Sequence, residues 1–351
     1  MPIHWESTIK YLRQKPLPWK ICFYCNNIQK WSSASLISVL QTDDRLKNAF
    51  TPSVFIAPET FNGKQKRMEQ FRQLKDFFGN DAIEGYDAER DKYYGFPHCD
   101  IAVYNQPWDM PKAHVSSVLV QNGILPVTIA YSATMMHINP YALGHYKHAY
   151  KLYVPTIGSV ESIQTSIKNT NCTAVFKGWP RYDGYISYPA CADDVEWKGT
   201  GKRVIYSPHW SFADRYYKFG TFTWSGEIVY DLAVQHPEIS FCFRPHPTFD
   251  LYLKRALKWS VQEIEEFYNK WKSLPNAVVN KYDLPLPLLW SSDYLFTDCG
   301  GFSADYLMMN KPAVFIRRKD SLPSAALARA AYSYSRRSGC RRQFYLYACH
   351  V

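Results

Sequence analysis

The stretch Phe241-Cys242-Phe243-Arg244-Pro245-His246-Pro247 begins as an apolar strand, predicted over residues 240–244, and ends in a stiff polar turn. Its two prolines restrict the backbone, so Arg244 and His246 are held at the carboxyl end of a buried strand. Open α/β sheets bind ligands at this edge. A guanidinium suits two-point contact with phosphate oxygens, and an imidazole can donate to a phosphate or transfer a proton. The alternative is a strand-end turn whose side chains simply face water.

A second strand, predicted over residues 294–297, ends at Asp298 and is followed by a turn that contains Gly300 and Gly301. We expect this turn to open a helix over residues 302–309. Glycines let a ligand approach the backbone closely, and the first free N–H groups of a helix attract anions. Ser303 adds a hydroxyl donor. The pattern matches neither the dinucleotide-binding nor the ATP-binding glycine motif, so it predicts a different phosphate site, or else an ordinary strand–helix turn.

A third strand, over residues 204–207, leads into Pro208-His209-Trp210. Because the carboxyl ends of parallel strands share one edge of a sheet, we expect His209 to lie beside the other two turns. Its side chain either contacts an acceptor or a diphosphate, or only caps the turn.

Short apolar segments alternate with helical patterns on both sides of these turns, which predicts parallel sheets covered on both faces. The chain therefore reads as an α/β protein with two Rossmann-like parallel-sheet domains facing a cleft. We place the domains at residues 1–185 and 202–316, with a linker over 186–201 and a basic tail of uncertain structure over 317–351. Further strands are expected at residues 21–25, 53–57, 101–104, 126–131, 151–154, 173–176, 277–279 and 313–316, and helices at 35–41, 63–78, 114–121, 227–235, 261–272 and 287–291.

The N-terminal domain offers fewer chemical signals. His137 follows a predicted strand and could act as the general base that deprotonates an acceptor hydroxyl. His145 and His148 have metal-like spacing but no accompanying carboxylate, which favours a surface helix. The segment 105–109, Asn-Gln-Pro-Trp-Asp, is a further candidate for the edge of the cleft.

The composition narrows the class of protein. A chain of 351 residues with 46% hydrophobic residues suits two packed domains. Cys22 and Cys25 lie in an apolar run, and no second pair follows at zinc-site spacing, so we expect core thiols rather than a metal site. No long apolar segment and no apolar signal-type stretch near Met1 is present, and we expect a cytoplasmic protein.

The net charge of +10 would ordinarily suggest nucleic acid or membrane as a partner. Residues 317–351 hold eight Lys and Arg against one acid, so +7 of that charge belongs to the tail. The rest of the chain is nearly balanced, and we expect no nucleic-acid partner. The tail is either a flexible basic segment that could dock on the anionic inner face of a membrane, or the product of a missing or frame-shifted natural C-terminus.

The order and spacing of these motifs resemble the CDP-glycerol glycerophosphotransferase family of teichoic-acid and capsule synthesis. The resemblance covers residues 151–316 well, and the first 150 residues only in layout. It rests on Tyr206-Ser207-Pro208-His209-Trp210, Arg244-Pro245-His246-Pro247, the series Ser292-Asp293, Thr297-Asp298, Phe302-Ser303, Asp305 and Lys311-Pro312, and the turn Gly178-Trp179-Pro180-Arg181-Tyr182-Asp183.

The resemblance implies a GT-B fold, with a nucleotide diphosphate donor in the C-terminal domain and a polymer or lipid-linked acceptor in the N-terminal one. Arg244 and His246 would contact the donor pyrophosphate, and Asp298 with the turn after it would lie at the donor phosphates or glycerol. Three departures stand out. Gly300-Gly301 replaces a frequent Ser-Ser, His209 replaces a Thr, and the His-Gly-Thr-Pro that supplies the family's proposed base is absent, with His137 the nearest substitute.

The sequence thus predicts a transferase that moves a glycerol-phosphate-like group from CDP-glycerol, or a similar donor, to a hydroxyl of a cell-surface polymer. His137 or His246 would take the hydroxyl proton, while Arg244 and the helix N-terminus would stabilise the leaving nucleotide. The sequence shows no dedicated metal site, and whether the reaction uses a Mg²⁺ ion bound with the substrate is left open. The alternatives are a GT-B glycosyltransferase or epimerase that uses a nucleotide sugar, and a catalytically inactive truncated remnant or binding protein.

Overall fold

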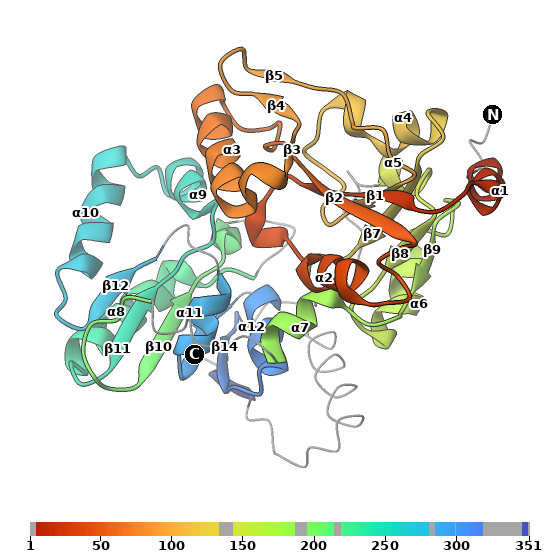
Figure 1. Ribbon diagram of the computed structural model, residues 1–351. Helices are drawn as coiled ribbons and strands as arrows, with labels where there is room; N and C mark the ends of the chain where they lie inside the picture. The colour runs from red at the N-terminus through yellow and green to blue at the C-terminus, as the bar shows by residue number, and fades with distance from the viewer. Residues whose placement is uncertain are drawn as a thin grey trace. The chain divides into compact units, whose positions relative to one another are not determined.

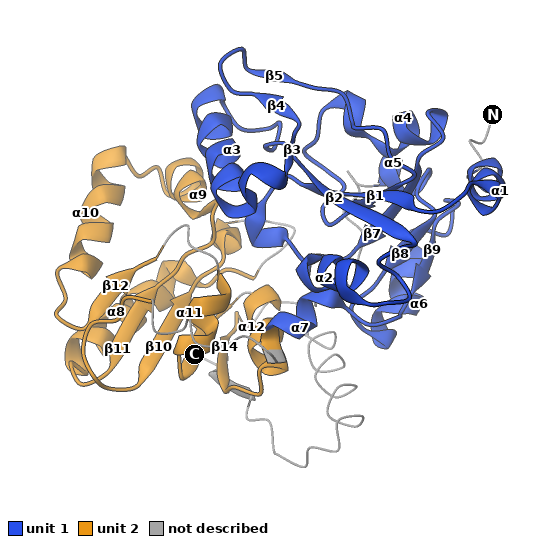
Figure 2. Ribbon diagram, in the orientation of Figure 1, with its two compact units in different colours: residues 1–184 blue, residues 185–351 orange. Residues whose placement is uncertain are grey.

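The chain forms two compact units, Met1–Gly184 and Tyr185–Val351, which Figure 2 shows in separate colours. The computed structural model describes residues 5–132, 143–186, 195–213, 219–280, 285–298, 300–318 and 346–349. Each unit is built around a parallel sheet with helices in the connections (Figure 1).

The N-terminal unit contains a seven-stranded sheet in the order β3-β2-β1-β6-β7-β8-β9. All neighbouring strands run parallel. Its elements are α1 (Glu6–Gln14), β1 (Trp19–Cys25), η1 (Ile28–Lys30), α2 (Ala34–Thr42), β2 (Phe50–Ile56), α3 (Lys64–Phe78), η2 (Gly79–Asp81), β3 (Ile83–Glu84), the antiparallel pair β4 (Tyr86–Asp87) and β5 (Lys92–Tyr93), β6 (Ile101–Tyr104), η3 (Lys112–His114), α4 (Ser116–Gln121), β7 (Leu125–Ile129), α5 (Leu143–Tyr146), β8 (Lys151–Tyr153), α6 (Ile157–Ser166), β9 (Thr173–Val175), η5 (Pro180–Tyr182) and α7 (Asp183–Ile186), the last of which crosses the boundary between the units.

The C-terminal unit contains a six-stranded parallel sheet in the order β12-β11-β10-β13-β14-β15. The last strand belongs to the segment that the sequence marks as a basic tail. The elements are β10 (Arg203–Ser207), η7 (Trp210–Ala213), α8 (Phe222–Gln235), β11 (Ser240–Phe243), α9 (Phe249–Ala256), α10 (Val261–Lys272), β12 (Ala277–Val279), α11 (Pro285–Ser291), β13 (Tyr294–Thr297), α12 (Gly300–Met308), β14 (Ala313–Ile316) and β15 (Leu346–Cys349).

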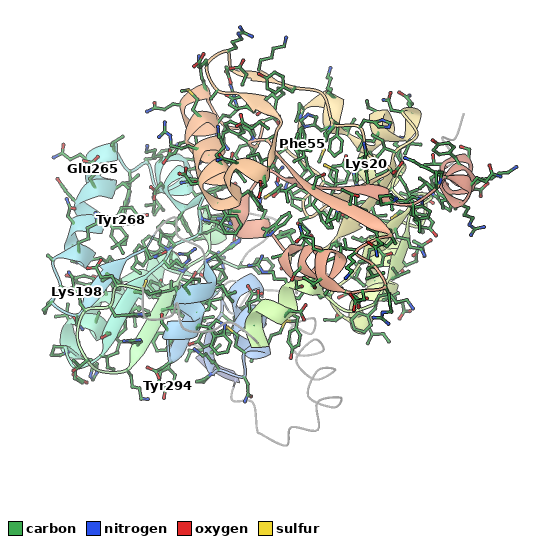
Figure 3. The ribbon with its side chains drawn as sticks, in the orientation of Figure 1. Lys20, Phe55, Lys198, Glu265, Tyr268 and Tyr294 are labelled. Atoms are coloured by element: carbon green, nitrogen blue, oxygen red, sulfur yellow. The ribbon has the colours of Figure 1, made fainter. Side chains whose placement is uncertain are left out.

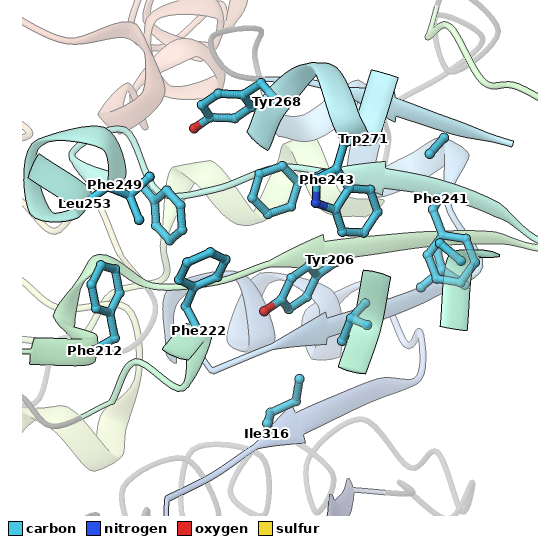
Figure 4. Packing of buried hydrophobic residues seen from close by; sticks show 14 of the residues in the cluster. Tyr206, Phe212, Phe222, Phe241, Phe243, Phe249, Leu253, Tyr268, Trp271 and Ile316 are labelled. Carbon is cyan, nitrogen blue, oxygen red and sulfur yellow. The ribbon is translucent and has the colours of Figure 1, made fainter. Parts of the chain in front are cut away.

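Both faces of the C-terminal sheet are buried, as expected for parallel strands with helical crossovers. One face packs against α8, α9 and α10 in an aromatic core (Figure 4). There the rings of Phe243 and Trp271 stack with centroids 5.0 Å apart and planes 9° from parallel. Tyr268, also labelled in Figure 3, joins α10 to α9 by donating its hydroxyl to Asp250 at 2.5 Å. This core holds the strand ends of the C-terminal sheet in place.

Helix α10 begins with a capping box, in which Ser260 accepts from the backbone of Glu263 and Glu263 accepts from the backbone of Ser260. We expect Ser260→Ala to lower the free energy of unfolding by about 1 kcal/mol, because it leaves a first-turn N–H without its partner. Thermal unfolding of this variant, with Ser260→Asp as the control that retains a cap, measures the effect. Equal midpoints for Ser260→Ala and the wild type would contradict it.

The predicted α/β class with two Rossmann-like parallel sheets is confirmed, and every strand expected from the sequence is present with ends within three residues of the prediction. Helix α12 begins at Gly300, two residues earlier than predicted, because both glycines enter its first turn. Helices α1, α6, α7 and α9 were not predicted. A helix is present around His145, as predicted, but the expected surface position of this side chain was wrong, since His145 is only 7% exposed and its Nε2 lies 2.8 Å from the Thr128 hydroxyl.

The strand orders determine where each sheet leaves room for a ligand. In the C-terminal unit the chain runs from β10 to β12 on one side, then returns to place β13 on the other side of β10. The same reversal separates β1 from β6 in the N-terminal unit. Ligands of open α/β sheets bind at the carboxyl ends of the strands beside such a reversal. Each unit therefore has one preferred edge position for a site.

Candidate functional site

The structure brings the three strand-end turns of the C-terminal unit together at its reversal point. His209 follows β10, His246 follows β11, and their rings lie with centroids 5.0 Å apart at 69°. The backbone N–H of His209 donates to Asp298 Oδ1 at 2.6 Å, which joins the ends of β10 and β13. The Arg244 guanidinium carbon lies 5.7 Å from the centre of the Phe302 ring in α12. These links assemble one polar site from three separate motifs.

The two histidines have the same local hydrogen-bond pattern. Each Nδ1 accepts from the backbone N–H two residues later, at 3.3 Å from Ser211 and 3.2 Å from Thr248. The side-chain hydroxyls of the same two residues lie 2.8 and 2.9 Å from those Nδ1 atoms. A backbone N–H can only donate, so both Nδ1 atoms carry lone pairs and both neutral rings carry their proton on Nε2.

Ser211 reinforces this assignment for His209. Its oxygen accepts from the backbone N–H groups of Phe219 at 3.3 Å and Gly220 at 3.0 Å, which leaves its own proton for Nδ1 of His209. A Cβ at Gly220 would stand 2.3 Å from the backbone nitrogen of Phe212, so only glycine fits there. The turn after β10 therefore fixes which nitrogen of His209 is a donor.

Asp298 is buried, with 1% of its surface exposed. Besides the N–H of His209, it accepts from the backbone N–H of Thr221 at 2.6 Å and the Thr221 hydroxyl at 2.9 Å. Burial raises the pKa of Asp298 to about 7, although the hydrogen bonds from Thr221 and His209 act in the opposite direction. These hydrogen bonds to Asp298 hold the turn after β10 against the start of α8.

A chain of buried hydroxyls continues from Asp298 into the core. The Thr221 hydroxyl lies 2.9 Å from that of Ser225, which lies 3.0 Å from the hydroxyl of Tyr206. Each of these groups can donate in either direction. The chain therefore accommodates both the ionised and the protonated form of Asp298 by reversing its donors.

Arg244 and the first turn of α12 lie on the other side of the site. Arg244 is 4% exposed, and its Nη1 donates to the side-chain oxygen of Asn280. Gly300 and Gly301 are partly exposed at the start of α12, where backbone N–H groups lack helical partners. The Ser303 hydroxyl donates to the carbonyl of Gly300 at 2.9 Å. Its predicted contact with a donor phosphate stays a prediction.

The turn that contains Gly178 stabilises the N-terminal unit. Gly178 has φ +99, a conformation that favours glycine. Trp179 Nε1 donates to the carbonyl of Ala130 at 2.6 Å, and Arg181 Nη1 donates to the carbonyl of Gln29 at 3.0 Å. This motif of the family resemblance thus ties segments beyond β7 and β1 together.

His137, predicted as a general base, lies outside the described residues, as does most of the basic tail. In the described part of the chain, no group of three or more His, Cys, Asp or Glu is arranged to hold a metal ion. A search of the same residues for a helix long and apolar enough to span a membrane finds none.

Sequence reasoning missed Ser211, Thr248 and Thr221, which orient the site residues. A signal for the first two is present, since His209-Trp210-Ser211 and His246-Pro247-Thr248 both place a hydroxyl two residues after a histidine. Such residues bond readily to nearby backbone and side-chain groups. Thr221 carries no such signal, because it meets Asp298 only in the folded unit.

No family model and no curated protein matches this chain. Solved structures do resemble it. The UDP-GlcNAc 2-epimerase of Methanocaldococcus jannaschii, in complex with UDP-GlcNAc and UDP, is 12% identical, with a TM-score of 0.55 over 88% of this chain and 86% of that one. The UDP-GlcNAc 2-epimerase of Neisseria meningitidis, bound to UDP-GlcNAc, is 14% identical, with a TM-score of 0.53 over 88% and 84%.

A variant of the wall teichoic acid polymerase TagF is 14% identical, with a TM-score of 0.51 over 85% of this chain and 70% of that one. Identities this low establish the fold alone. The chain is an α/β protein whose two Rossmann-like units have their structural neighbours among GT-B proteins.

Proposed function

We propose that this protein is a transferase that moves a glycerol-phosphate-like group from CDP-glycerol, or a similar nucleotide diphosphate, to a hydroxyl of a cell-surface polymer. The observation that carries the proposal is the pair His209 and His246, whose Nδ1 atoms are both occupied while their rings lie 5.0 Å apart. Two Nε2–H donors so close together suit neighbouring oxygens of a pyrophosphate.

The charges of the site fit the same reaction. Arg244 adds a permanent positive charge to the two imidazole donors, and the first-turn N–H groups of α12, at the partly exposed Gly300 and Gly301, favour an anion. As the acceptor hydroxyl gives its proton to a base and its oxygen bonds to phosphorus, the bond to the nucleotide breaks, and the nucleoside monophosphate leaves with the electron pair. Donors fixed before the reaction stabilise that developing charge. Because Nδ1 of His246 is occupied, we assign His246 the role of donor to the leaving group rather than that of general base.

A second candidate is a GT-B enzyme that acts on a nucleotide sugar. Two of the similar structures are epimerases solved with UDP-GlcNAc, and the proposed donors would hold the pyrophosphate of either ligand. We keep Mg²⁺ as an optional partner of that pyrophosphate. The excess of basic residues over positions 317–351 would suit an anionic membrane surface on which a lipid-linked acceptor is presented.

A nucleotide-release assay tests the proposal. We expect CMP from CDP-glycerol with an acceptor polyol, and UDP from UDP-GlcNAc if the second candidate is correct. Arg244→Ala should weaken nucleotide binding roughly 10- to 100-fold, since a charge-assisted hydrogen bond contributes about 1.5–3 kcal/mol. Arg255→Ala, on the exposed surface of α9, is the control. A wild-type protein that binds neither nucleotide, or an Arg244→Ala variant that binds as tightly as wild type, would overturn the proposal.

A further inference from the structure

The N-terminal sheet has its own reversal point between β1 and β6, and the segments that follow these strands are unusually polar. Asn26 and Asn27 follow β1, and Asn105 and Gln106 follow β6. Glu59 follows the neighbouring strand β2. Apart from the half-buried Asn27, all of these side chains are at most 6% exposed. Burying so many polar groups is costly unless each is bonded, which makes their partners informative.

Glu59 is at the centre of this network and is fully satisfied. Its Oε1 accepts from Lys30 at 3.1 Å, Gln106 at 2.9 Å and Asn27 at 3.3 Å, and its Oε2 accepts from Gln70 at 3.0 Å. Burial alone would raise the pKa of Glu59, but the charge of Lys30 and these hydrogen bonds lower it. Glu59 is therefore a fixed negative charge of the framework.

Gln106 has an amide oxygen that the framework leaves unused. The side chain is 1% exposed, and among the described residues its Oε1 has no hydrogen-bond partner. The orientation of the amide is fixed, because its Nε2 donates to a carboxylate that can only accept. A hydroxyl group of a ligand is a donor from which this oxygen can accept.

Asp109 lies three residues after Gln106. Among the described residues, its carboxylate also has no hydrogen bond or ion pair. Its backbone has φ +57, and its carbonyl accepts from the N–H of Thr60 at 2.9 Å, which holds it against the loop of Glu59. Burial, and then the charge of Glu59, raise the pKa of Asp109, while Lys30 lowers it. A half-buried carboxylate of raised pKa is a better proton acceptor than an exposed one.

An aromatic surface completes the surroundings. The rings of Trp108 and Tyr131 are both half-buried and meet edge to face with centroids 5.5 Å apart. Lys30 Nζ lies 5.8 Å from the centre of the Trp108 ring. Apolar ring surface next to hydrogen-bonding groups is suited to the carbon skeleton and hydroxyls of a polyol or sugar.

We propose that this edge of the N-terminal sheet binds a polyol or sugar, one of whose hydroxyls donates to Gln106 while another, the attacking hydroxyl, loses its proton to Asp109. The proposal rests on the proposed function, for which it names the acceptor class and the base. The hydroxyl proton passes to the Asp109 carboxylate as the ligand oxygen bonds to the donor phosphorus. The phosphorus–oxygen bond to the nucleoside monophosphate breaks, and the monophosphate takes the electron pair.

The test compares Asp109→Asn with Asp76→Asn, which changes an exposed carboxylate on α3. With CDP-glycerol as donor and glycerol as acceptor probe, Asp109→Asn should lower the rate of CMP release about 100-fold, the low end of general base catalysis. Its affinity for CDP-glycerol should not change. The rate of CMP release by the wild type should rise as the pH rises through the pKa of Asp109, and this rise should be absent in Asp109→Asn. Among the described residues, the charged or titratable neighbours of Asp109 are Glu59, Lys30 and Tyr24.

Two outcomes overturn the proposal while leaving the donor site intact: release by Asp109→Asn at the wild-type rate, or an unchanged pH limb. If the wild type binds no CDP-glycerol, the proposed function fails separately. Hydrogen exchange then decides whether the N-terminal site exists. Glycerol should slow exchange in residues 104–110 of the wild type and less so in Asp109→Asn, whereas equal exchange with and without glycerol refutes the site.

Discussion

Replacing Asp298 by Ala should lower the free energy of unfolding of the C-terminal unit by roughly 3–5 kcal/mol, because it leaves buried donors without partners. The backbone N–H groups of His209 and Thr221 and the Thr221 hydroxyl all donate to this carboxylate. Asp298→Asn should cost less, since its amide oxygen can still accept one backbone N–H. Urea unfolding followed by circular dichroism gives the order wild type, Asn, Ala.

The pKa of Asp298 adds a pH dependence to this result. Burial raises that pKa to about 7, above an ordinary value near 4 in the unfolded chain. The folded state therefore binds the proton more tightly. The resulting stability is fully present below about pH 4 and is lost as the pH rises through about 7.

The Asn variant provides the comparison for this pH effect, because it cannot titrate. We expect the wild type to lose stability between pH 5 and pH 8 relative to Asp298→Asn. A constant difference between the two proteins over that range would contradict the raised pKa. An Ala variant as stable as the wild type would show that the three hydrogen bonds contribute nothing.

The sequence predicted the strands well for a physical reason. Each is a short apolar run that must be buried on both faces of a parallel sheet, such as residues 241–243 or 313–316. The turn after each run holds the polar residues, so the edge that carries the site could also be located. Helix α9 was missed because it follows His246-Pro247 directly, where the prolines suggest an extended turn.

The direction in which a side chain points could not be predicted. The two carboxylate oxygens of Asp298 accept from residues 209 and 221, which come close only after folding, and the predicted place of Asp298 at the donor phosphates stays a prediction. His145 was expected on a surface helix for lack of carboxylate partners, yet burial lowers its pKa to about 3. Both outcomes depend on tertiary packing, which one-dimensional spacing does not encode.

The largest effect on activity is expected for the histidine pair. His246→Ala should lower nucleotide release roughly 100- to 1000-fold, the range seen when one preorganised donor to a developing negative charge is removed. His246→Gln should recover part of the loss, because its amide N–H can stand near the position of Nε2. His236→Ala, which changes an exposed histidine at the end of α8, is the control and should act as wild type.

Thr248 provides a finer test of why His246 acts as a donor. Thr248→Val keeps the backbone N–H that donates to Nδ1 but removes the hydroxyl 2.9 Å from it, so the ring is held by one partner instead of two. We expect turnover to fall severalfold, which corresponds to the free energy of about one neutral hydrogen bond. Thr248→Ser should restore it. If His246 acted as a base through Nε2, it would need the opposite tautomer, with Nδ1 donating to the Thr248 hydroxyl, and Thr248→Val would also slow the reaction. His246→Gln therefore separates the two roles that the sequence left open for His246, because its amide N–H can donate but the amide cannot take the proton.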